Sequence, residues 1–205
     1  GASMRVKICG ITRVEDALAA ERAGADAVGL VFAPRSKRRV GLERAAAVSR
    51  ALGPFIARVG VFVDAPLAEV ERAVEAAGLT AVQLHGQESA EYAARLHGRV
   101  AVLRAVAFAP GLTPAALAGY PADAFLLDAA VPGSGTTFAW REASAWRGHP
   151  RLVLAGGLTP ANVGAAVAAL APYAVDVASG VESAPGVKDA EAIARFVAAA
   201  RAPRP

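Results

Sequence analysis

The chain has 205 residues, 55% of them hydrophobic, and a formal net charge of +4. This length suits one domain around one core, and no apolar run is long and uninterrupted enough to cross a bilayer. A single cysteine excludes an internal disulfide and a cysteine-rich metal site, and the scattered basic residues lack interleaved aromatic residues. We therefore expect a cytoplasmic protein that associates with neither membranes nor nucleic acids. Residues 1–3, before Met4, resemble an expression scar, so the predicted domain spans 4–205.

Short apolar runs alternate with alanine-rich amphipathic runs along the chain. The apolar runs are typical of buried parallel strands, and the amphipathic runs are typical of helices that cover them. The predicted strands are 5–11, 27–32, 57–63, 81–85, 100–107, 124–129, 151–155 and 175–179. The helices predicted after them are 13–23, 42–52, 66–77, 88–97, 113–118, 141–147, 160–170 and 189–200.

Eight strand–helix units in this length predict an α/β fold, namely a single-domain (β/α)₈ TIM barrel. A doubly wound open sheet is the alternative. It would more often have fewer strands and a glycine-rich turn after the first of them.

Residues at the ends of several runs support these helix boundaries. Thr12 precedes the first helix and Glu15 follows three residues later, which is the spacing of a capping box. Thr159, followed by a proline, predicts another helix start. Gly24 and Gly78 lie where the first and third helices are predicted to end.

Two reactive side chains end predicted strands. Cys9, the only cysteine, ends the first apolar run, and Asp128 ends the run 124–128. In a parallel barrel both would reach the face where barrel enzymes hold their catalytic groups. A lone cysteine is more often a buried small hydrophobe, but Lys7 on the same side of the strand would favour its thiolate. The two groups could then act together as a base and an acid on one small substrate, with a cap for the following loop as the alternative for Asp128.

The alternation of side chains within the strands predicts a polar barrel interior. The apolar neighbours of Lys7 and Cys9 are expected to face the helices, which turns these two side chains toward the barrel axis. Buried charges persist only when they are paired, so we expect Asp176 to pair with Lys7, Arg58 or both. The full predicted interior set is Lys7, Arg58, Gln83, Arg104 and Asp176.

Further polar residues extend the predicted site. The basic run 35–39 follows the second strand and is usually a solvated loop, but an arginine there could hold a carboxylate with its planar fork. His85 ends the fourth strand, where a functional role and a structural role carry equal weight. His97 and His149 are predicted to be surface residues.

Glycine-bearing turns follow the last two predicted strands. Gly156 and Gly157 follow the seventh strand, and Ser179 and Gly180 follow the eighth. Bare backbone N–H groups at these turns can approach a phosphate, and this is where barrels usually hold one. A further loop at 132–137 could close over a substrate or simply connect two elements.

Several motifs along the chain point to one enzyme family. They are Lys-Ile-Cys-Gly-Ile-Thr at 7–12, Ser-Lys-Arg at 36–38, Val-Gly-Val-Phe-Val at 59–63, Gln-Leu-His-Gly at 83–86, Leu-Leu-Asp at 126–128, Gly-Ser-Gly-Thr-Thr-Phe at 133–138, Ala-Gly-Gly-Leu at 155–158 and Val-Asp-Val-Ala-Ser-Gly-Val-Glu at 175–182. Together they resemble the phosphoribosylanthranilate isomerases of tryptophan biosynthesis.

The resemblance implies a (β/α)₈ barrel that catalyses an Amadori rearrangement without a metal or an organic cofactor. N-(5′-phosphoribosyl)anthranilate would become 1-(2-carboxyphenylamino)-1-deoxyribulose 5-phosphate. Cys9 would be the general base, Asp128 the general acid and Arg38 the group that binds the anthranilate carboxylate. The two glycine turns would bind the phosphate, and His85 would also contact the substrate.

Two other functions fit parts of the sequence. Another phosphosugar barrel, such as an epimerase or an α-subunit type of lyase, would use the glycine turns without needing both Cys9 and Asp128. A degenerate barrel that only binds a phosphometabolite would be expected to lack one of them. Ala139 and Ala178 depart from the aspartate and serine frequent in the family, which leaves the phosphate hydrogen bonds open. The expected partner is the small-molecule substrate, with the chain a monomer or a homodimer.

Overall fold

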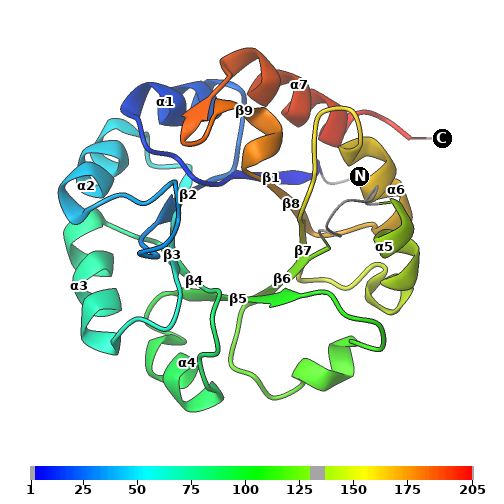
Figure 1. Cartoon of the computed structure of the whole chain (residues 1–205), viewed down its shortest axis with the longest axis horizontal. Helices are drawn as coiled ribbons and strands as arrows, with labels where there is room; N and C mark the ends of the chain where they lie inside the picture. The colour runs from blue at the N-terminus through cyan, green and yellow to red at the C-terminus, as the bar shows by residue number, and fades with distance from the viewer. Residues whose placement is uncertain (1–2, 130–136, 205) are drawn as a thin grey trace.

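The computed structural model describes residues 3–129 and 137–204. Eight parallel strands close into a barrel in chain order, which confirms the predicted fold (Figure 1). The predicted scar at 1–3 and the loop at 132–137 lie largely outside the described residues. The barrel strands are β1 (Arg5–Ile8), β2 (Ala27–Val31), β3 (Ala57–Phe62), β4 (Ala81–Leu84), β5 (Ala101–Ala107), β6 (Ala124–Asp128), β7 (Leu152–Ala155) and β8 (Ala174–Val177).

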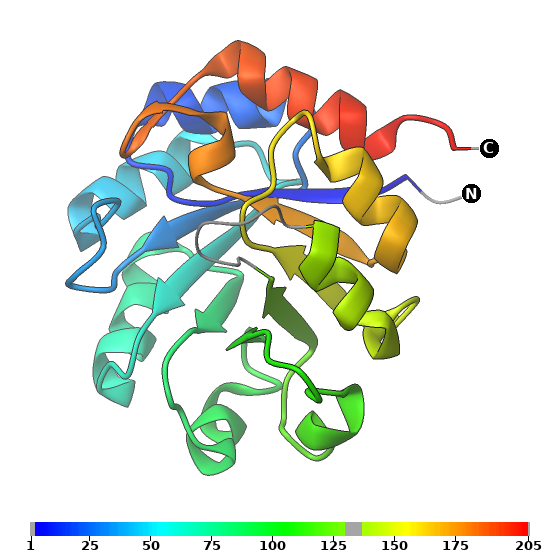
Figure 2. The same cartoon turned by 45° about the vertical axis from the view of Figure 1, so that its right-hand side comes forward.

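Helices form an outer ring around the barrel (Figures 1 and 2). Within the described residues, none of them is long and apolar enough to cross a membrane. The segment predicted as a helix at 113–118 is a 3₁₀ turn, η1 (Pro114–Leu117), because Gly111 and Gly119 on either side leave too few residues for a stable α-helix. The helices are α1 (Val14–Arg22), α2 (Leu42–Ala51), α3 (Leu67–Ala77), α4 (Ala90–Leu96), α5 (Thr137–Glu142), α6 (Val163–Leu170) and α7 (Ala190–Arg201), with short 3₁₀ turns η2 (Ser144–Trp146) and η3 (Ser179–Val181).

The main apolar core lies between the strands and the helices. Ile8, Leu84 and Leu154 are fully buried there, each on a different strand. Burial of such a side chain contributes roughly 1.5–3 kcal/mol relative to exposure. A smaller apolar cluster, which includes Leu126 and Val153, lies inside the barrel. Both faces of each strand are therefore buried, which is why the strands read as continuous apolar runs.

The side chains of Arg58 and Arg104 make their hydrogen bonds to loops, a helix end and a strand end and do not fill the barrel interior, so this part of the sequence prediction is wrong. Arg104 donates to the backbone oxygens of Leu84 and Gly86 and to Glu88, and so braces the loop after β4. Arg58 caps the C-terminal end of α2, where it donates to the carbonyl oxygens of Ser49, Leu52, Gly53 and Ile56.

Strand register explains this error. Arg58 lies beside Val28 on β2, a fully buried residue of the outer core. Val61, three residues further along β3 and therefore on its other side, lies beside Gln83, and both line the cavity at one end of the barrel. The inward side of β3 is thus the valine side. The local pattern could not distinguish the two sides, because both are apolar.

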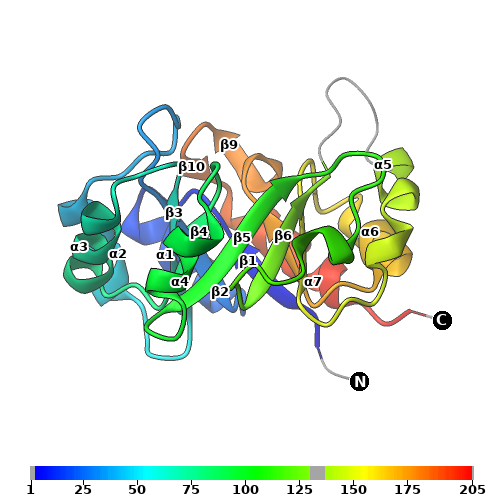
Figure 3. The ribbon, with the colours of Figure 1, turned by 90° about the horizontal axis from the view of Figure 1, so that it is seen from below.

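A hairpin that the sequence did not predict follows β8. Its strands are β9 (Glu182–Ala184) and β10 (Val187–Lys188), and it lies on the same side of the barrel as the C-terminal ends of the strands (Figure 3). The hydroxyl of Thr12 donates to the carbonyl of Gly186 in this hairpin instead of capping α1. The predicted capping box is therefore wrong.

Three other predicted helix boundaries have different outcomes. Thr159 does not begin a helix: it exchanges hydrogen bonds with Asn162, and α6 begins at the next residue. Gly78 ends α3 in the left-handed conformation, with φ of 62°, and Gly24 follows α1 with φ of 90°. These two predicted helix ends are confirmed.

Candidate active site

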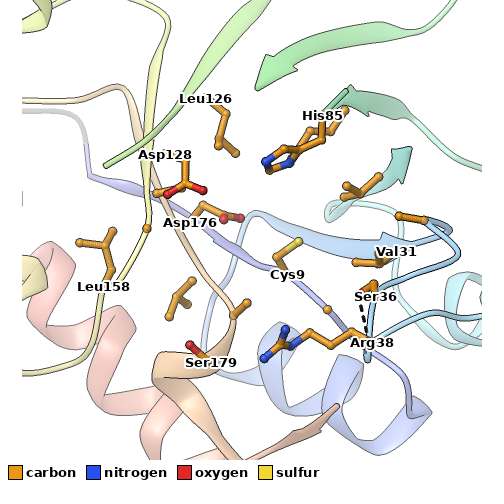
Figure 4. Close-up of a pocket in the computed structure, with 18 of the residues that line it drawn as sticks. Cys9, Val31, Ser36, Arg38, His85, Leu126, Asp128, Leu158, Asp176 and Ser179 are labelled. Atoms are coloured by element: carbon orange, nitrogen blue, oxygen red, sulfur yellow. Dashed lines mark hydrogen bonds between the residues drawn. The ribbon is translucent and has the colours of Figure 1, made fainter. Parts of the chain in front are cut away.

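A pocket with a cavity volume of about 420 Å³ opens at the C-terminal ends of the strands. Figure 4 shows the side chains of Cys9, Arg38, His85 and Asp128 arranged around it. The structure brings every residue predicted for the site to this pocket, namely Cys9, Arg38, His85, Asp128, Gly156, Gly157, Ser179 and Gly180. His97 and His149 lie outside it: His97 pairs with Asp123, and the ring of His149 packs near that of Trp146.

Cys9 directly follows β1, and its N–H donates to the carbonyl of Val177 on β8 at 2.8 Å. A Cβ at Gly29 on β2 would lie 2.5 Å from the Cys9 Sγ, so glycine leaves the space that the sulfur occupies. Burial raises the pKa of the Cys9 thiol, and the charge of Lys7 lowers it by less. Lys7 thus favours the thiolate as expected, but burial outweighs it, and most of the thiol is protonated at neutral pH.

Lys7 lies two residues before Cys9 in the chain, and its ammonium group is buried. Its Nζ donates to the Asp176 carboxylate at 2.8 Å and to the Gln83 Oε1 at 2.9 Å. Burial disfavours the charged ammonium and is the largest single influence on it, but the charges of Asp176 and Cys9 and the hydrogen bonds to them together outweigh burial, and the pKa of Lys7 is raised. The predicted pair of Asp176 with Lys7 is confirmed, whereas the proposed pair with Arg58 is wrong.

Asp128 ends β6, where its carbonyl accepts a hydrogen bond from Phe108 at 2.8 Å. His85 follows β4, and its Nδ1 lies 3.0 Å from the Gln83 Nε2. Burial lowers the pKa of His85, and the negative charge of Asp128 opposes this shift without reversing it. The imidazole is therefore largely neutral at pH 7.

Arg38 is fixed in the pocket by groups from three loops. Its Nε and Nη2 donate to the two carboxylate oxygens of Glu182, at 2.8 and 2.6 Å. The hydroxyl of Ser36 accepts from its backbone N–H at 3.1 Å. Its side chain crosses Gly10 so closely that a Cβ there would overlap it. This bidentate geometry leaves Nη1 available to a ligand, since no described residue accepts from it.

Lys188 connects the segments around Arg38 through hydrogen bonds from its ammonium group. Its Nζ donates to the carbonyl oxygens of Cys9 and Ala178 and to the Glu182 carboxylate. Burial lowers the pKa of Lys188, with Glu182 opposing the shift. Burial likewise favours protonation of Glu182, but the hydrogen bond from Arg38 and the charge of Lys188 lower its pKa overall. Glu182 is thus an anion shared by two cations.

The glycine turns form another part of the pocket wall. Gly156 and Gly157 both have positive φ, 94° and 68°, which favours glycine because it lacks a Cβ. The side chain of Asn162 donates to the carbonyl of Gly157 at 2.9 Å and holds this turn. A Cβ on Gly180 would overlap the carbonyl oxygen of Leu158, so the two turns touch through backbone atoms. Such closely packed bare backbone can present N–H groups to an anion.

Sequence reasoning missed the supporting residues of this site. Glu182 ends the last quoted motif but received no role, and neither Gly10 nor Lys188 was singled out. The partners of Arg38 lie far from it in the chain, with Glu182 144 residues away. No local pattern signals such a contact. Within the described ranges, no cluster of His, Cys, Asp and Glu side chains is arranged to hold a metal ion.

The chain is similar along most of its length to one group of enzymes. A family model described as N-(5'phosphoribosyl)anthranilate (PRA) isomerase matches residues 6–199. An N-(5′-phosphoribosyl)anthranilate isomerase from Geobacter sp. (strain M21) is 51% identical over 201 residues, which cover 96% of this chain and 98% of the relative.

Two solved structures extend the similarity to three dimensions. One is phosphoribosyl anthranilate isomerase in complex with reduced 1-(o-carboxyphenylamino)-1-deoxyribulose 5-phosphate. It has a TM-score of 0.81 and 40% identity, over 96% of this chain and 98% of that one. The other is a monomeric form of the dimeric enzyme from Thermotoga maritima, with a TM-score of 0.82 and 39% identity over 97% and 99% of the two chains.

Proposed function

This chain belongs to the N-(5′-phosphoribosyl)anthranilate isomerase family, and we propose that Cys9 and Asp128 supply the general base and the general acid of its reaction. The family's reaction is the isomerisation step of tryptophan biosynthesis, so the chain is an isomerase. One observation carries the assignment of roles: both side chains line one pocket, each at the C-terminal end of a barrel strand.

The proposed reaction is an Amadori rearrangement that begins with two proton transfers by side chains. Asp128, which has to carry a proton when the substrate binds, gives it to the furanose ring oxygen as the ring C–O bond breaks. This leaves a protonated Schiff base between the sugar and the anthranilate nitrogen. The Cys9 thiolate then removes the proton from the adjacent sugar carbon and forms a neutral enolamine.

The enolamine becomes the ketone when its hydroxyl proton moves to carbon, which gives 1-(2-carboxyphenylamino)-1-deoxyribulose 5-phosphate. Substrate and product are isomers, so Cys9 and Asp128 regain their starting protonation states through solvent. Both groups stand at the ends of strands, which keeps their positions relative to the sugar fixed. This proposed mechanism uses no metal or organic cofactor.

The two ends of the substrate match two groups of residues in the pocket. The free Nη1 of Arg38 supports binding of the anthranilate carboxylate, since a guanidinium donates to carboxylates in its plane. The turns at 156–157 and 179–180 support binding of the phosphate by backbone N–H groups. The distance between the two groups of residues would then direct the sugar to the base and the acid.

The assay follows the loss of phosphoribosylanthranilate fluorescence. We expect Cys9→Ala and Asp128→Asn each to lower kcat by about a thousandfold, within the usual contribution of a general acid or base. Asp123→Asn is the matched control, because Asp123 precedes β6 at the opposite end of the barrel and, within the described residues, its carboxylate bonds Val102 and His97. Turnover near that of the wild type in either active-site variant would remove that residue from the mechanism.

For the oligomeric state we propose a homodimer, in line with the dimeric Thermotoga maritima relative. Phe55, in the loop before β3, is 99% exposed at the end of the barrel opposite the pocket. Light scattering on the wild type and Phe55→Asp tests this: a dimer that dissociates in the variant supports it, and a wild-type monomer overturns it.

We also propose a cytoplasmic location, because a reactive thiol needs a reducing compartment. Cell fractionation checks it.

A further inference from the structure

A chain of hydrogen bonds crosses the barrel interior and ends in the pocket. The Asp176 carboxylate accepts from the Lys7 ammonium at 2.8 Å, and the same ammonium donates to the Gln83 Oε1 at 2.9 Å. The Gln83 Nε2 then lies 3.0 Å from the Nδ1 of His85. Lys7 and Gln83 are 4% and 2% exposed, so water does not compete for these bonds.

The Lys7 ammonium fixes which group donates and which group accepts in each of these hydrogen bonds. An ammonium has only hydrogens to offer, so Lys7 must face the oxygen of the Gln83 amide and not its nitrogen. The amide NH₂ group is then turned toward His85, and it too can only donate. The Nδ1 of His85 must therefore accept, which requires that it carry a lone pair and no proton.

We propose that Gln83 is a positioning residue that holds His85 as a neutral imidazole with its proton on Nε2, and that this N–H is presented to an oxygen atom of the bound sugar. The proposal rests on the proposed function, because it takes the pocket as the site of the sugar. Figure 4 shows the ring of His85 directed into the pocket, toward the space bordered by Cys9 and Asp128.

The surroundings of His85 agree with this neutral form. Burial lowers its pKa, and the charge of Lys7 acts in the same direction, against the opposing charges of Asp128, Asp176 and Glu88. Protonation of Nδ1 would also direct an N–H at the amide hydrogens of Gln83. In this tautomer Nε2 has no lone pair, so His85 donates a hydrogen bond to the sugar but takes no proton from it. That task stays with Cys9.

Nuclear magnetic resonance of ¹⁵N-labelled histidine tests the tautomer directly. The chain has three histidines, and His97 and His149 lie outside the pocket, so they serve as internal references. The wild type is expected to show a protonated Nε2 and an unprotonated Nδ1 at neutral pH. A protonated Nδ1, or a mixture of both tautomers, overturns the proposal.

Gln83→Glu is the decisive variant. A carboxylate accepts from both Lys7 and the imidazole, so the proton of His85 should move to Nδ1 and the pKa of His85 should rise. Gln87→Glu is the matched control, since it makes the same change on the exposed loop after β4 and leaves the His85 signals unchanged. An unchanged tautomer in Gln83→Glu overturns the proposal. If that variant does not fold, Gln83→Met removes the donor and should give a tautomer mixture; a retained Nε2 proton then overturns it.

Kinetics test whether the N–H reaches the substrate. In Gln83→Glu the neutral imidazole lacks the Nε2 proton, whereas the imidazolium at lower pH has it. The ratio of kcat/KM between variant and wild type should therefore fall by about three- to tenfold as pH rises through the pKa of His85 in the variant. A ratio that does not change with pH overturns the contact with substrate. The magnetic resonance experiment uses the free protein, so failure of the proposed base and acid would leave its result intact.

Discussion

The wall of the pocket near Cys9 and the wall near Asp128 are held by different forces. Beneath Cys9, Lys7 is paired with Asp176 in the barrel interior, and Lys188 with Glu182 beside it. The interior below Asp128 is apolar, with Leu126 and its neighbours in one cluster. The two glycine turns of the pocket meet where Gly180 packs against the backbone carbonyl of Leu158.

This difference agrees with the two chemical tasks that we propose for these parts of the pocket. A base that must become an anion benefits from a fixed cation nearby, and Lys7 lowers the pKa of Cys9. A phosphate dianion is held by N–H groups, which need bare backbone rather than side chains. The base side should therefore be sensitive to the loss of a charge, and the phosphate side to added volume. The following experiments separate these sensitivities.

The largest effect on stability is expected for Asp176→Asn. It leaves the buried Lys7 ammonium without its anion, which costs roughly 3–5 kcal/mol of unfolding free energy. Because the charge of Asp176 raises the pKa of Cys9, the same variant should shift the rise of kcat/KM to lower pH. Urea unfolding and a pH profile measure the two effects. Glu71→Gln breaks the exposed pair with Arg99 and should change stability by less than about 1 kcal/mol. A similar loss in both variants would contradict the comparison.

On the phosphate side, Gly180→Ala should displace the turn, because its Cβ would overlap the Leu158 carbonyl. Loss of one hydrogen bond to a charged phosphate costs about 1.5–3 kcal/mol, or roughly tenfold or more in KM. Gly41→Ala is the control, since a Cβ there meets open space. Steady-state kinetics of both proteins decide the matter, and an unchanged KM in Gly180→Ala would separate this turn from phosphate binding.

Arg38→Lys tests the Arg38–Glu182 ion pair, which we propose binds the anthranilate carboxylate. A lysine cannot bridge Glu182 and a carboxylate with one planar group, so KM should rise by an amount equal to roughly 1–3 kcal/mol, with a smaller change in kcat. Glu182→Gln should show the same pattern more weakly, because Arg38 keeps its charge but loses its fixed orientation. Arg39→Lys, on the exposed neighbour, serves as the control. A fall in kcat alone would assign Arg38 to the chemical step instead.

The smallest effect concerns the pH dependence of Cys9. Its pKa lies above the ordinary value of 9.0, so the protonated thiol persists to higher pH than in the unfolded chain. Both kcat/KM and the rate of iodoacetamide alkylation should therefore increase with pH above neutrality. Lys7→Met removes the opposing cation and should move both curves to still higher pH. Mass spectrometry gives an unambiguous readout, because the chain has one cysteine. Alkylation of the native protein that is faster than that of the unfolded chain at pH 7 would contradict this.

The sequence could predict the barrel and its reactive residues because both depend on local patterns. Eight apolar runs alternating with amphipathic runs define eight strand–helix units, and the parallel arrangement brings every strand end to one face. That is enough to bring Cys9 and Asp128 to one pocket. The glycine turns could be predicted in the same way, because they follow the last two strands in the sequence and therefore lie at the same face of the barrel.

Tertiary structure alone decided which side of each strand faces the interior and what holds the functional side chains. Arg58 and Arg104 were assigned to the wrong side, because in a barrel covered by helices both sides of a strand are apolar and only register separates them. The hydroxyl of Thr12 was assigned to a helix cap, yet a hairpin more than 170 residues away takes it. The contacts of Arg38 with Glu182 and of Lys7 with Asp176 likewise join distant segments. The hydrophobic periodicity of the sequence determines the strands and helices. These pairings form only when the barrel closes and brings the last strand and its loop against the first strand.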